Sequence, residues 1–245
     1  MSAVFDRLAS RYDAIWTTTP VGRAQRSQVW RRIDALFGPG DVLLDVGCGT
    51  GEDAAHLAGR GVRVHATDPS PAMIRIAAQR GGFTTAVAGG EEIEQSTVSY
   101  DGVLSNFGAL NCVADPAKVA RKLAAVTRPG GRVALCTMGR FCLWETTYYA
   151  VRMNVGKALR RLSRDPLMTS LGVAIHYPSI ATLREAFEPD FTCERWVGVG
   201  LFVPPSYVRI PAPLVRILAV LDNVFAGWPI LRGLADHRLI ILVRR

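Results

Sequence analysis

The sequence predicts an α/β domain with a doubly wound, mostly parallel sheet, and three features of the chain indicate this. The first is the run VLLDVGCGTG at 42–51, where a short apolar segment ends in an acidic residue and three alternating glycines follow. The second is the adjoining EDAAHLAGRG at 52–61, whose alanines and leucine form the apolar stripe of a helix. The third is a pair of later apolar runs, 62–67 and 100–105, each of which ends in polar residues. Strands that alternate with helices in this way build a parallel sheet.

The glycine run indicates that a small ligand lies across the turn from strand to helix. Gly47, Gly49 and Gly51 allow a sharp turn and leave the backbone bare for a ligand. Their register is G-x-G-x-G rather than the G-x-G-x-x-G of a dinucleotide site, and Glu52 follows at once. Asp45 would repel a pyrophosphate but suits a ligand that carries an ammonium group. No Gly-Lys-Ser/Thr follows the glycines, which excludes a P-loop.

With these residues the chain resembles the class I S-adenosylmethionine-dependent methyltransferases, whose first motif the run 42–51 matches throughout. The resemblance implies a Rossmann-like sheet of seven strands with the last strand antiparallel, and S-adenosyl-L-methionine as the cofactor. It assigns cofactor contacts to the loop residues Asp45, Gly47, Cys48, Gly49 and Gly51.

The second strand and the helix after it supply two further expected contacts. Asp68 stands at the tip of the second strand, where a carboxylate is placed to accept hydrogen bonds from a ribose diol. NAD carries the same ribose, so Asp68 alone does not choose between the two cofactors. Ser70 is the expected N-cap of the next helix, and Met73 lies in the first turn of that helix. The resemblance implies an adenine contact for Met73, and ordinary core packing is the alternative.

The loop that reads the adenine departs from the family pattern. Gly89 stands where the family has an aspartate that binds the adenine. In this chain Glu91, backbone groups or a shifted loop must therefore bind the adenine instead. The fourth strand ends in Asn106 and Phe107, which we expect beside the sulfonium because ligands bind at the carboxyl ends of such strands. The Pro-Gly-Gly at 129–131, before an apolar strand, is a further family feature.

The first forty residues predict a helical cap in front of the core. Phe5-Asp6-Arg7-Leu8-Ala9-Ser10-Arg11-Tyr12-Asp13 is similar to the start of the ubiquinone/menaquinone C-methyltransferase group and its small-molecule relatives. The resemblance implies that Tyr12 folds over the methionyl part of the cofactor. Packing as an ordinary amphipathic-helix residue is the alternative for Tyr12. Arg23 and Arg26 could reach a carboxylate in the same cap, and surface positions explain them equally well.

An insertion at 138–178 is expected to form a roof over the crevice, because it follows the fifth strand and is longer than a plain connection. It is rich in aromatic residues, which predicts an apolar acceptor pocket. If the acceptor must lose a proton, the candidate bases are His176, Tyr148 and Glu145, in that order. A structural role for His176 is the more common outcome for a lone histidine.

The remaining residues, 179–245, are expected to complete a single domain of cap (1–40), cofactor-binding half (41–137), roof and C-terminal half. A helix IATLREAF capped by Ser179, a strand over 194–203 and a final strand over 237–243 are predicted. An apolar helix over 213–225 is too short and too charged to span a bilayer. Core packing is the first reading of this helix, and a place on a membrane or over a lipophilic substrate is the alternative.

Composition narrows the classes of partner. The five cysteines are scattered without a C-x-x-C pair, which argues against disulfides and a metal site and, with no apolar leader at the N-terminus, predicts the cytoplasm. The net charge of +8 is carried almost wholly by arginine, and its densest cluster, 157–164, reads first as a solvated helix face. Contact with anionic lipid or a phosphorylated substrate comes second. Nucleic acid is disfavoured because no flipped-base motif follows the fourth strand.

These observations predict transfer of a methyl group from S-adenosylmethionine to a small, lipophilic acceptor, aromatic or isoprenoid-like, at carbon, oxygen or nitrogen. Two alternatives remain. The first is a non-catalytic adenosylmethionine-binding regulatory or partner subunit, since binding residues do not prove transfer. The second is an NAD-dependent dehydrogenase, which the glycine register disfavours. The sequence carries no signal for the oligomeric state.

Overall fold

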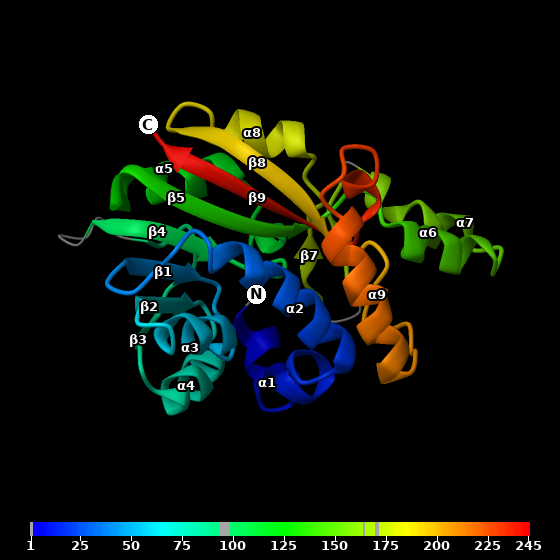
Figure 1. Ribbon diagram of the computed structural model, residues 1–245, viewed down its shortest axis with the longest axis horizontal. Helices are drawn as coiled ribbons and strands as arrows, with labels where there is room; N and C mark the ends of the chain where they lie inside the picture. Colours follow the sequence, from blue (N-terminus) through cyan, green and yellow to red (C-terminus); the bar gives the residue numbers. More distant parts are fainter. Residues whose placement is uncertain (1, 94–98, 164, 170–171) are drawn as a thin grey trace.

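A seven-stranded mixed sheet forms the centre of the protein in a computed structural model that describes residues 2–93, 99–163, 165–169 and 172–245 (Figure 1). The strand order is β3-β2-β1-β4-β5-β9-β8, the doubly wound arrangement that the sequence predicts. The strands are β1 (Val42–Val46), β2 (Arg63–Asp68), β3 (Thr84–Val87), β4 (Tyr100–Ser105), β5 (Thr127–Met138), β8 (Phe191–Val199) and β9 (His237–Arg244).

Strands β1 to β5 run parallel, and β9 lies between β5 and β8 antiparallel to both. The prediction of an antiparallel last strand is therefore confirmed. In β1, Asp45 pairs with Ala66 of β2 on one side and with Leu104 of β4 on the other. The strand order reverses between β1 and β4, and ligands bind at the carboxyl ends of the strands at such a switch point.

Helices cover both faces of the sheet and make two hydrophobic layers (Figure 1). Leu123, Phe187 and Leu135 belong to the layer under α5 and α8, while Ile33 and Leu57 belong to the layer under α2 and α3. The helices are α1 (Ser2–Tyr12), α2 (Pro20–Ile33), α3 (Glu52–Ala58), α4 (Pro71–Arg80), α5 (Pro116–Val126), α6 (Leu143–Ala150), α7 (Val155–Ala158), α8 (Ile180–Phe187) and α9 (Ala212–Phe225), with a π-helical turn at Asp13–Thr17 and 3₁₀ turns at Leu110–Cys112, Arg160–Leu162 and Arg232–Leu234.

Side-chain caps begin several of these helices where the sequence places them. The Ser70 hydroxyl accepts a hydrogen bond from the Met73 amide, and the Ser179 hydroxyl accepts one from the Thr182 amide. Both predicted caps are confirmed, and each satisfies an amide that a helix start would otherwise leave unpaired.

The strand predicted over 194–203 lies at 191–199 instead. Gly200 adopts a left-handed φ of +71° and turns the chain out of the sheet. The next three amides, from Leu201 to Val203, donate hydrogen bonds to the buried carboxylate of Asp222 in α9 rather than to a neighbouring strand. The side chain of Gln28 in α2 also donates to Asp222, so one carboxylate joins the loop, α9 and the cap.

The two insertions lie together at one end of the molecule (Figure 1). The first contains α6, α7 and a short hairpin of β6 (Leu167–Met168) and β7 (Ala174–Ile175), and the second is dominated by α9. The Trp144 indole donates to the Phe202 carbonyl at 2.9 Å, and the Tyr207 hydroxyl donates to Glu145 at 2.9 Å. In the described part of the chain no helix is long and apolar enough to cross a bilayer.

The Asp222→Asn variant should lower the free energy of unfolding by about 2–3 kcal/mol, because an amide nitrogen would face amide donors that now bind a carboxylate oxygen. Urea denaturation followed by circular dichroism measures this difference. The matched control is Glu185→Gln, which removes the same charge from an exposed position of α8. Equal stability of the two variants would contradict the role given to Asp222.

Candidate functional site

A cavity of about 540 Å³ opens at the carboxyl ends of β1 and β4. The glycine loop after β1, the tip of β2, the exit of β4 and the cap helix α1 all contribute to its wall. Several residues of the predicted site line it: Tyr12, Gly47, Cys48, Gly49, Asp68, Met73, Glu91, Asn106 and Phe107. Residues that lie far apart in the sequence thus meet in one place.

The glycine loop holds a backbone conformation that side chains would obstruct. Gly47, Gly49 and Gly51 have φ values of +74°, +56° and +79°, which favour glycine. A methyl group on Gly47 would collide with Ala109, and one on Gly51 would come within 2.9 Å of Ala77. The first and third glycines therefore serve close packing, whereas Gly49 leaves its backbone open towards the cavity.

Asp68 joins the tip of β2 to the glycine loop. Its carboxylate accepts hydrogen bonds from the Gly49 amide at 3.0 Å and from the Ser70 amide at 2.9 Å. Burial raises the pKa of Asp68, while these two amides oppose the rise. The carboxylate lines the cavity and has acceptor capacity left for a diol, as the sequence predicts.

Asp53 is a functional residue that the sequence reasoning missed. Its buried carboxylate accepts hydrogen bonds from Arg26, from the Trp30 indole at 2.6 Å and from the Asn106 amide at 3.0 Å. It therefore joins α3, the cap helix α2 and the exit of β4. An acid in the first turn of the helix after the glycines was the signal that could have found it.

Arg26 brings a cation to the wall of the cavity. One guanidinium nitrogen binds Asp53, whereas Nε is buried with no hydrogen-bond partner among the described residues. A ligand with a carboxylate would satisfy this donor. The methionyl part of S-adenosylmethionine carries such a carboxylate, so Arg26 would hold that end and Asp68 would hold the ribose.

Tyr12 lies over the loop, where the resemblance placed it. A methyl group on Gly49 would be 3.9 Å from Cε1 of Tyr12. Burial raises the pKa of Tyr12 to about 12, so it remains a neutral phenol at neutral pH. The adjoining Asp13 accepts a hydrogen bond from the Thr50 hydroxyl at 2.6 Å, which joins the cap to the glycine loop.

The expected adenine side contains Met73 and the loop at 89–92. Met73 is 1% exposed and also packs with Ala9 and Ala72, so it is part of a small core as well as of the cavity wall. Glu92, not Glu91, folds back onto the loop and accepts a hydrogen bond from the Gly89 amide at 2.8 Å. Glu91 pairs with Lys118 at 3.8 Å near the surface, and both glutamates line the cavity.

Asp45 lies behind the loop rather than in the cavity wall. It is 1% exposed, and its Oδ2 has no hydrogen-bond partner among the described residues. Burial and the nearby Asp53 raise the pKa of Asp45 well above its ordinary value, and Arg26 opposes this rise. Its expected action on an ammonium group stays a prediction, and the structure gives it no direct path to a ligand.

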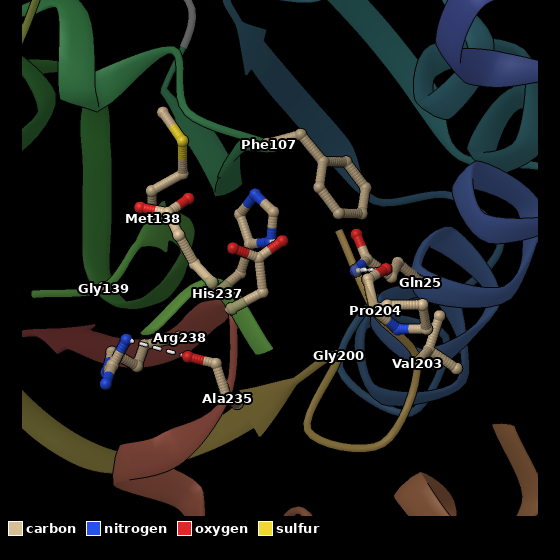
Figure 2. A network of polar contacts seen from close by, with 12 residues as sticks. Gln25, Phe107, Met138, Gly139, Gly200, Val203, Pro204, Ala235, His237 and Arg238 are labelled. Atoms are coloured by element: carbon tan, nitrogen blue, oxygen red, sulfur yellow. Dashed lines mark hydrogen bonds and ion pairs between the residues drawn. The ribbon is translucent and has the colours of Figure 1, made fainter. Parts of the chain in front are cut away.

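Phe107 is the centre of an aromatic cluster on the far side of the loop after β4. Its φ of +47° is unusual for a residue with a bulky side chain and marks local strain, which gathers at functional sites. Its ring makes edge contacts with Trp16 of the cap at a centroid distance of 5.5 Å and with His237 at the start of β9 at 5.3 Å. Figure 2 shows Phe107 and His237. The Arg26 guanidinium lies 5.1 Å from the same ring.

None of the three predicted bases lines this cavity among the described residues, and His176 is the nearest case. His176 lines an adjoining cavity with Ser179, and Leu110 forms part of the wall of both cavities. Its backbone is tied to Asn111, whose carbonyl accepts from the His176 amide at 2.7 Å. The first insertion packs against Asn111, and this contact places His176 on the side of the shared wall that belongs to the adjoining cavity.

Glu145 and Tyr148 belong to the first insertion and serve its structure. Glu145 is 1% exposed and accepts hydrogen bonds from Arg160, Arg161 and Tyr207. Burial would raise the pKa of Glu145, but the two guanidinium groups outweigh it and lower the pKa, which makes a poor proton acceptor. Tyr148 packs on Tyr207 and carries Arg152 over its ring. None of the described residues of 138–178 lines this cavity, but Arg140, Ser163 and His176 line the adjoining one, so the expected roof over the crevice stays a prediction.

Asp236 and His237 form an acid–imidazole pair that the sequence reasoning also missed. Asp236 Oδ2 lies 3.3 Å from Nδ1 of His237, and Arg161 binds the other carboxylate oxygen at 2.8 Å. Burial would raise the pKa of Asp236, yet His237 and Arg161 hold it well below its usual range, so it stays ionised. Because β9 is antiparallel, its first residue lies at the ligand-binding edge, next to Phe107.

The Asp45→Asn variant should change the pH dependence of stability. Because the pKa of Asp45 is raised, the folded state keeps this proton to higher pH than the unfolded state does. The stabilisation that the proton gives to the folded state is therefore lost as pH rises. The variant's free energy of unfolding relative to the natural protein should therefore rise as pH increases above the ordinary aspartate pKa of about 4, by up to about 1.4 kcal/mol per pH unit. Denaturant titrations without cofactor measure this, and a parallel pH profile for Asp45→Asn and the exposed control Asp165→Asn would contradict it.

Comparison with known proteins places this geometry in a family. A protein-family model described as a methyltransferase domain matches residues 43–131, which include the glycine loop and Asp68. A demethylmenaquinone methyltransferase of Renibacterium salmoninarum is 32% identical over 89% of this chain and 90% of its own length. The enzyme of the same name from Thermobifida fusca is 33% identical over 56% of this chain, and the chain spans only 60% of the length of that relative.

Solved structures share the fold. An S-adenosylmethionine-dependent methyltransferase from Thermotoga maritima aligns over 100% of this chain and 99% of its own, with a TM-score of 0.67 and 18% identity. Another from Mesorhizobium loti covers 89% of this chain and 98% of its own, with a TM-score of 0.64 and 20% identity. With the matching cavity residues and the relative aligned over nine-tenths of its length, the chain belongs to the class I S-adenosylmethionine-dependent methyltransferases.

Proposed function

We propose that this protein transfers the methyl group of S-adenosylmethionine to a lipophilic aromatic acceptor of the demethylated quinone type. The observation that carries the proposal is the cavity, in which the glycine loop, Asp68 and Arg26, whose buried Nε has no hydrogen-bond partner among the described residues, line one space of about 540 Å³. Each of these features would bind a different part of one cofactor. The backbone of the glycine loop would lie against the cofactor, Asp68 would bind its ribose, and Arg26 would bind its carboxylate.

The class of acceptor rests on two supports. Phe107 lines the cofactor cavity, and the rings of Trp16 and His237 pack against the Phe107 ring, so this part of the wall is apolar. The relatives aligned with this chain are named demethylmenaquinone methyltransferases, and the cap sequence at 5–13 is similar to that group. A ring carbon of a reduced quinone is therefore the acceptor atom that we propose.

The chain's own residues would position the reactants and move one proton. The cofactor, when bound, supplies a methyl group that is already activated as a sulfonium. Asp68 and Arg26 would fix it, and Tyr12 would cover it and keep water out. His237, whose Nδ1 lies 3.3 Å from Oδ2 of Asp236, would accept the hydroxyl proton of the acceptor at Nε2 and leave the ring carbon electron-rich. Once the methyl group is bonded to this carbon, the ring C–H proton is released and the oxygen regains a proton, which restores the aromatic ring.

The function is tested by incubating the protein with radiolabelled S-adenosylmethionine and a reduced demethylated naphthoquinone with a short isoprenoid tail. Label in the organic phase, with the methyl on a ring carbon by mass spectrometry, is the expected result. Label found only in tRNA or protein would contradict it. Cofactor binding by calorimetry without any turnover, across quinone, phenol and amine acceptors, would instead support the non-catalytic subunit.

The Gly47→Ala variant should weaken binding of S-adenosylhomocysteine at least about tenfold, because the added methyl meets Ala109 at a left-handed φ of +74° and displaces the loop. Isothermal titration calorimetry measures the affinity, and circular dichroism verifies the fold. Gly156→Ala is the matched control, since Gly156 has open space around it and should bind as the natural protein does. Equal affinities for the two variants would argue against the loop as the cofactor site.

The His237→Gln variant should lower kcat by about 10²-fold with little change in KM for the acceptor, because it removes the proton acceptor but keeps the packing against Phe107. His176→Gln tests the sequence prediction in parallel. A larger loss of kcat in His176→Gln than in His237→Gln would overturn the assignment to His237.

A further inference from the structure

Large apolar side chains are exposed mainly in the two insertions. Among the described residues, sixteen large hydrophobic side chains are exposed, and fourteen of them fall within 143–168 or 207–230. The other two, Ile15 and Val87, are isolated from these segments in the sequence. Scattered exposed apolar residues are normal, but a concentration of this kind marks an interaction surface.

Helix α9 is apolar on its outer side as well as on its inner side. The inner side packs on the cap and on the loop after β8, through Val215 with Val21 and Val203. The outer side bears Leu214, Ile217, Val220, Val224 and, beyond the helix end, Trp228, with exposed fractions from 41% to 62%. Their spacing of three and four residues forms one continuous stripe. Core packing, which the sequence analysis gave as the first interpretation of this helix, accounts for its inner side only.

The turn between α6 and α7 forms a second apolar projection. Val151, Met153 and Val155 are 74%, 86% and 60% exposed. Met153 has a φ of +54°, so the turn holds this side chain in place at the cost of strain. Arg152 lies between Val151 and Met153 in the sequence, and Lys157 follows Val155 by two positions, so exposed cations accompany the apolar side chains of this projection.

The charges near both patches have one sign. The sequence from 146 to 163 contains four cations and no anion, and the sequence from 196 to 221 contains two cations and no anion. Of these, Arg152, Lys157, Arg209 and Arg216 are exposed. Asp222 lies in α9 but is buried and bound to three amides, and Asp165 is the exposed anion at the end of the first segment. The charge complement of such a surface is anionic.

The two patches belong to one rigid unit. The Trp144–Phe202 and Tyr207–Glu145 hydrogen bonds join the insertions, and the rings of Tyr148 and Tyr207 pack on each other at 5.8 Å. Both insertions lie at the same end of the molecule (Figure 1). The unit also contacts the cap, because Trp16 packs in the cluster of Val203 and Val215 and meets Phe107 beside the cofactor cavity.

We propose that the two insertions form a surface that docks on an anionic lipid bilayer. The outer face of α9 and the α6–α7 turn enter the boundary between headgroups and acyl chains, and the flanking cations bind the headgroups. A second copy of this chain is disfavoured as the occupant, since its cations would face the same cations. The docking rests on this surface alone, while its use in delivering a lipophilic acceptor rests on the proposed function.

Vesicle flotation tests the docking. The protein is mixed with vesicles of phosphatidylcholine and phosphatidylglycerol, or of phosphatidylcholine alone. We expect at least about tenfold stronger partition to the anionic vesicles, with a further loss as salt rises. Replacing Ile217, Val220 and Val224 together by serine should lower partition to anionic vesicles at least about tenfold. The matched control, Ile15→Ser with Val87→Ser, removes exposed apolar groups elsewhere and should bind as the natural protein does.

Three results would overturn the proposal. They are equal partition to both kinds of vesicle, equal partition of the triple serine variant and the control, and a dimer in analytical ultracentrifugation that the triple variant abolishes. Because the substituted side chains are exposed, circular dichroism and melting should be unchanged, so loss of binding is not loss of fold. Methyl transfer to a short-chain, water-soluble acceptor distinguishes the two proposals. The triple serine variant should retain this activity. If the natural protein lacks the activity, the proposed function is contradicted and the docking proposal is not affected.

Discussion

The carboxylate of Asp53 is the contact on which the arrangement of the site depends. It accepts hydrogen bonds from Arg26 and Trp30 of the cap and from Asn106 at the exit of β4. Three segments that are separate in the sequence are thereby held around one cavity. Burying a carboxylate costs free energy unless hydrogen-bond donors surround it, and here the cap and the core both supply donors. The cap and the core therefore stabilise each other. The cap is consequently part of the site and not an added cover.

Buried acids beside the cavity give the site its electrostatic character. Asp45, Asp53 and Asp68 lie near one another, and burial raises the pKa of both Asp45 and Asp68. Arg26 is the cation among them, it lines the same cavity, and its buried Nε has no hydrogen-bond partner in the described part of the chain. A ligand with an ammonium group and a carboxylate matches this mixture of charges better than a pyrophosphate does. The geometry and the glycine register therefore agree on the cofactor.

The two insertions have a different physical organisation from the core. The interior of the first insertion is ionic, with Glu145 between Arg160 and Arg161, while the outer surface of both insertions is apolar. The ionic interior fixes the orientation of α6, since a broken pair would leave a buried charge. This arrangement leaves the apolar side chains of α9 and of the α6–α7 turn free for an external partner.

The sequence by itself determined the fold class, the helix caps at Ser70 and Ser179, and the methyl donor. These depend on local patterns, because a glycine register and a cap act within a few residues of chain. Only the tertiary structure decided that Asp53 joins the cap to the core and that His237 rather than His176 lies beside Phe107. Such contacts join residues far apart in sequence, and their partners are chosen by the closure of the whole sheet. No local pattern carries that information.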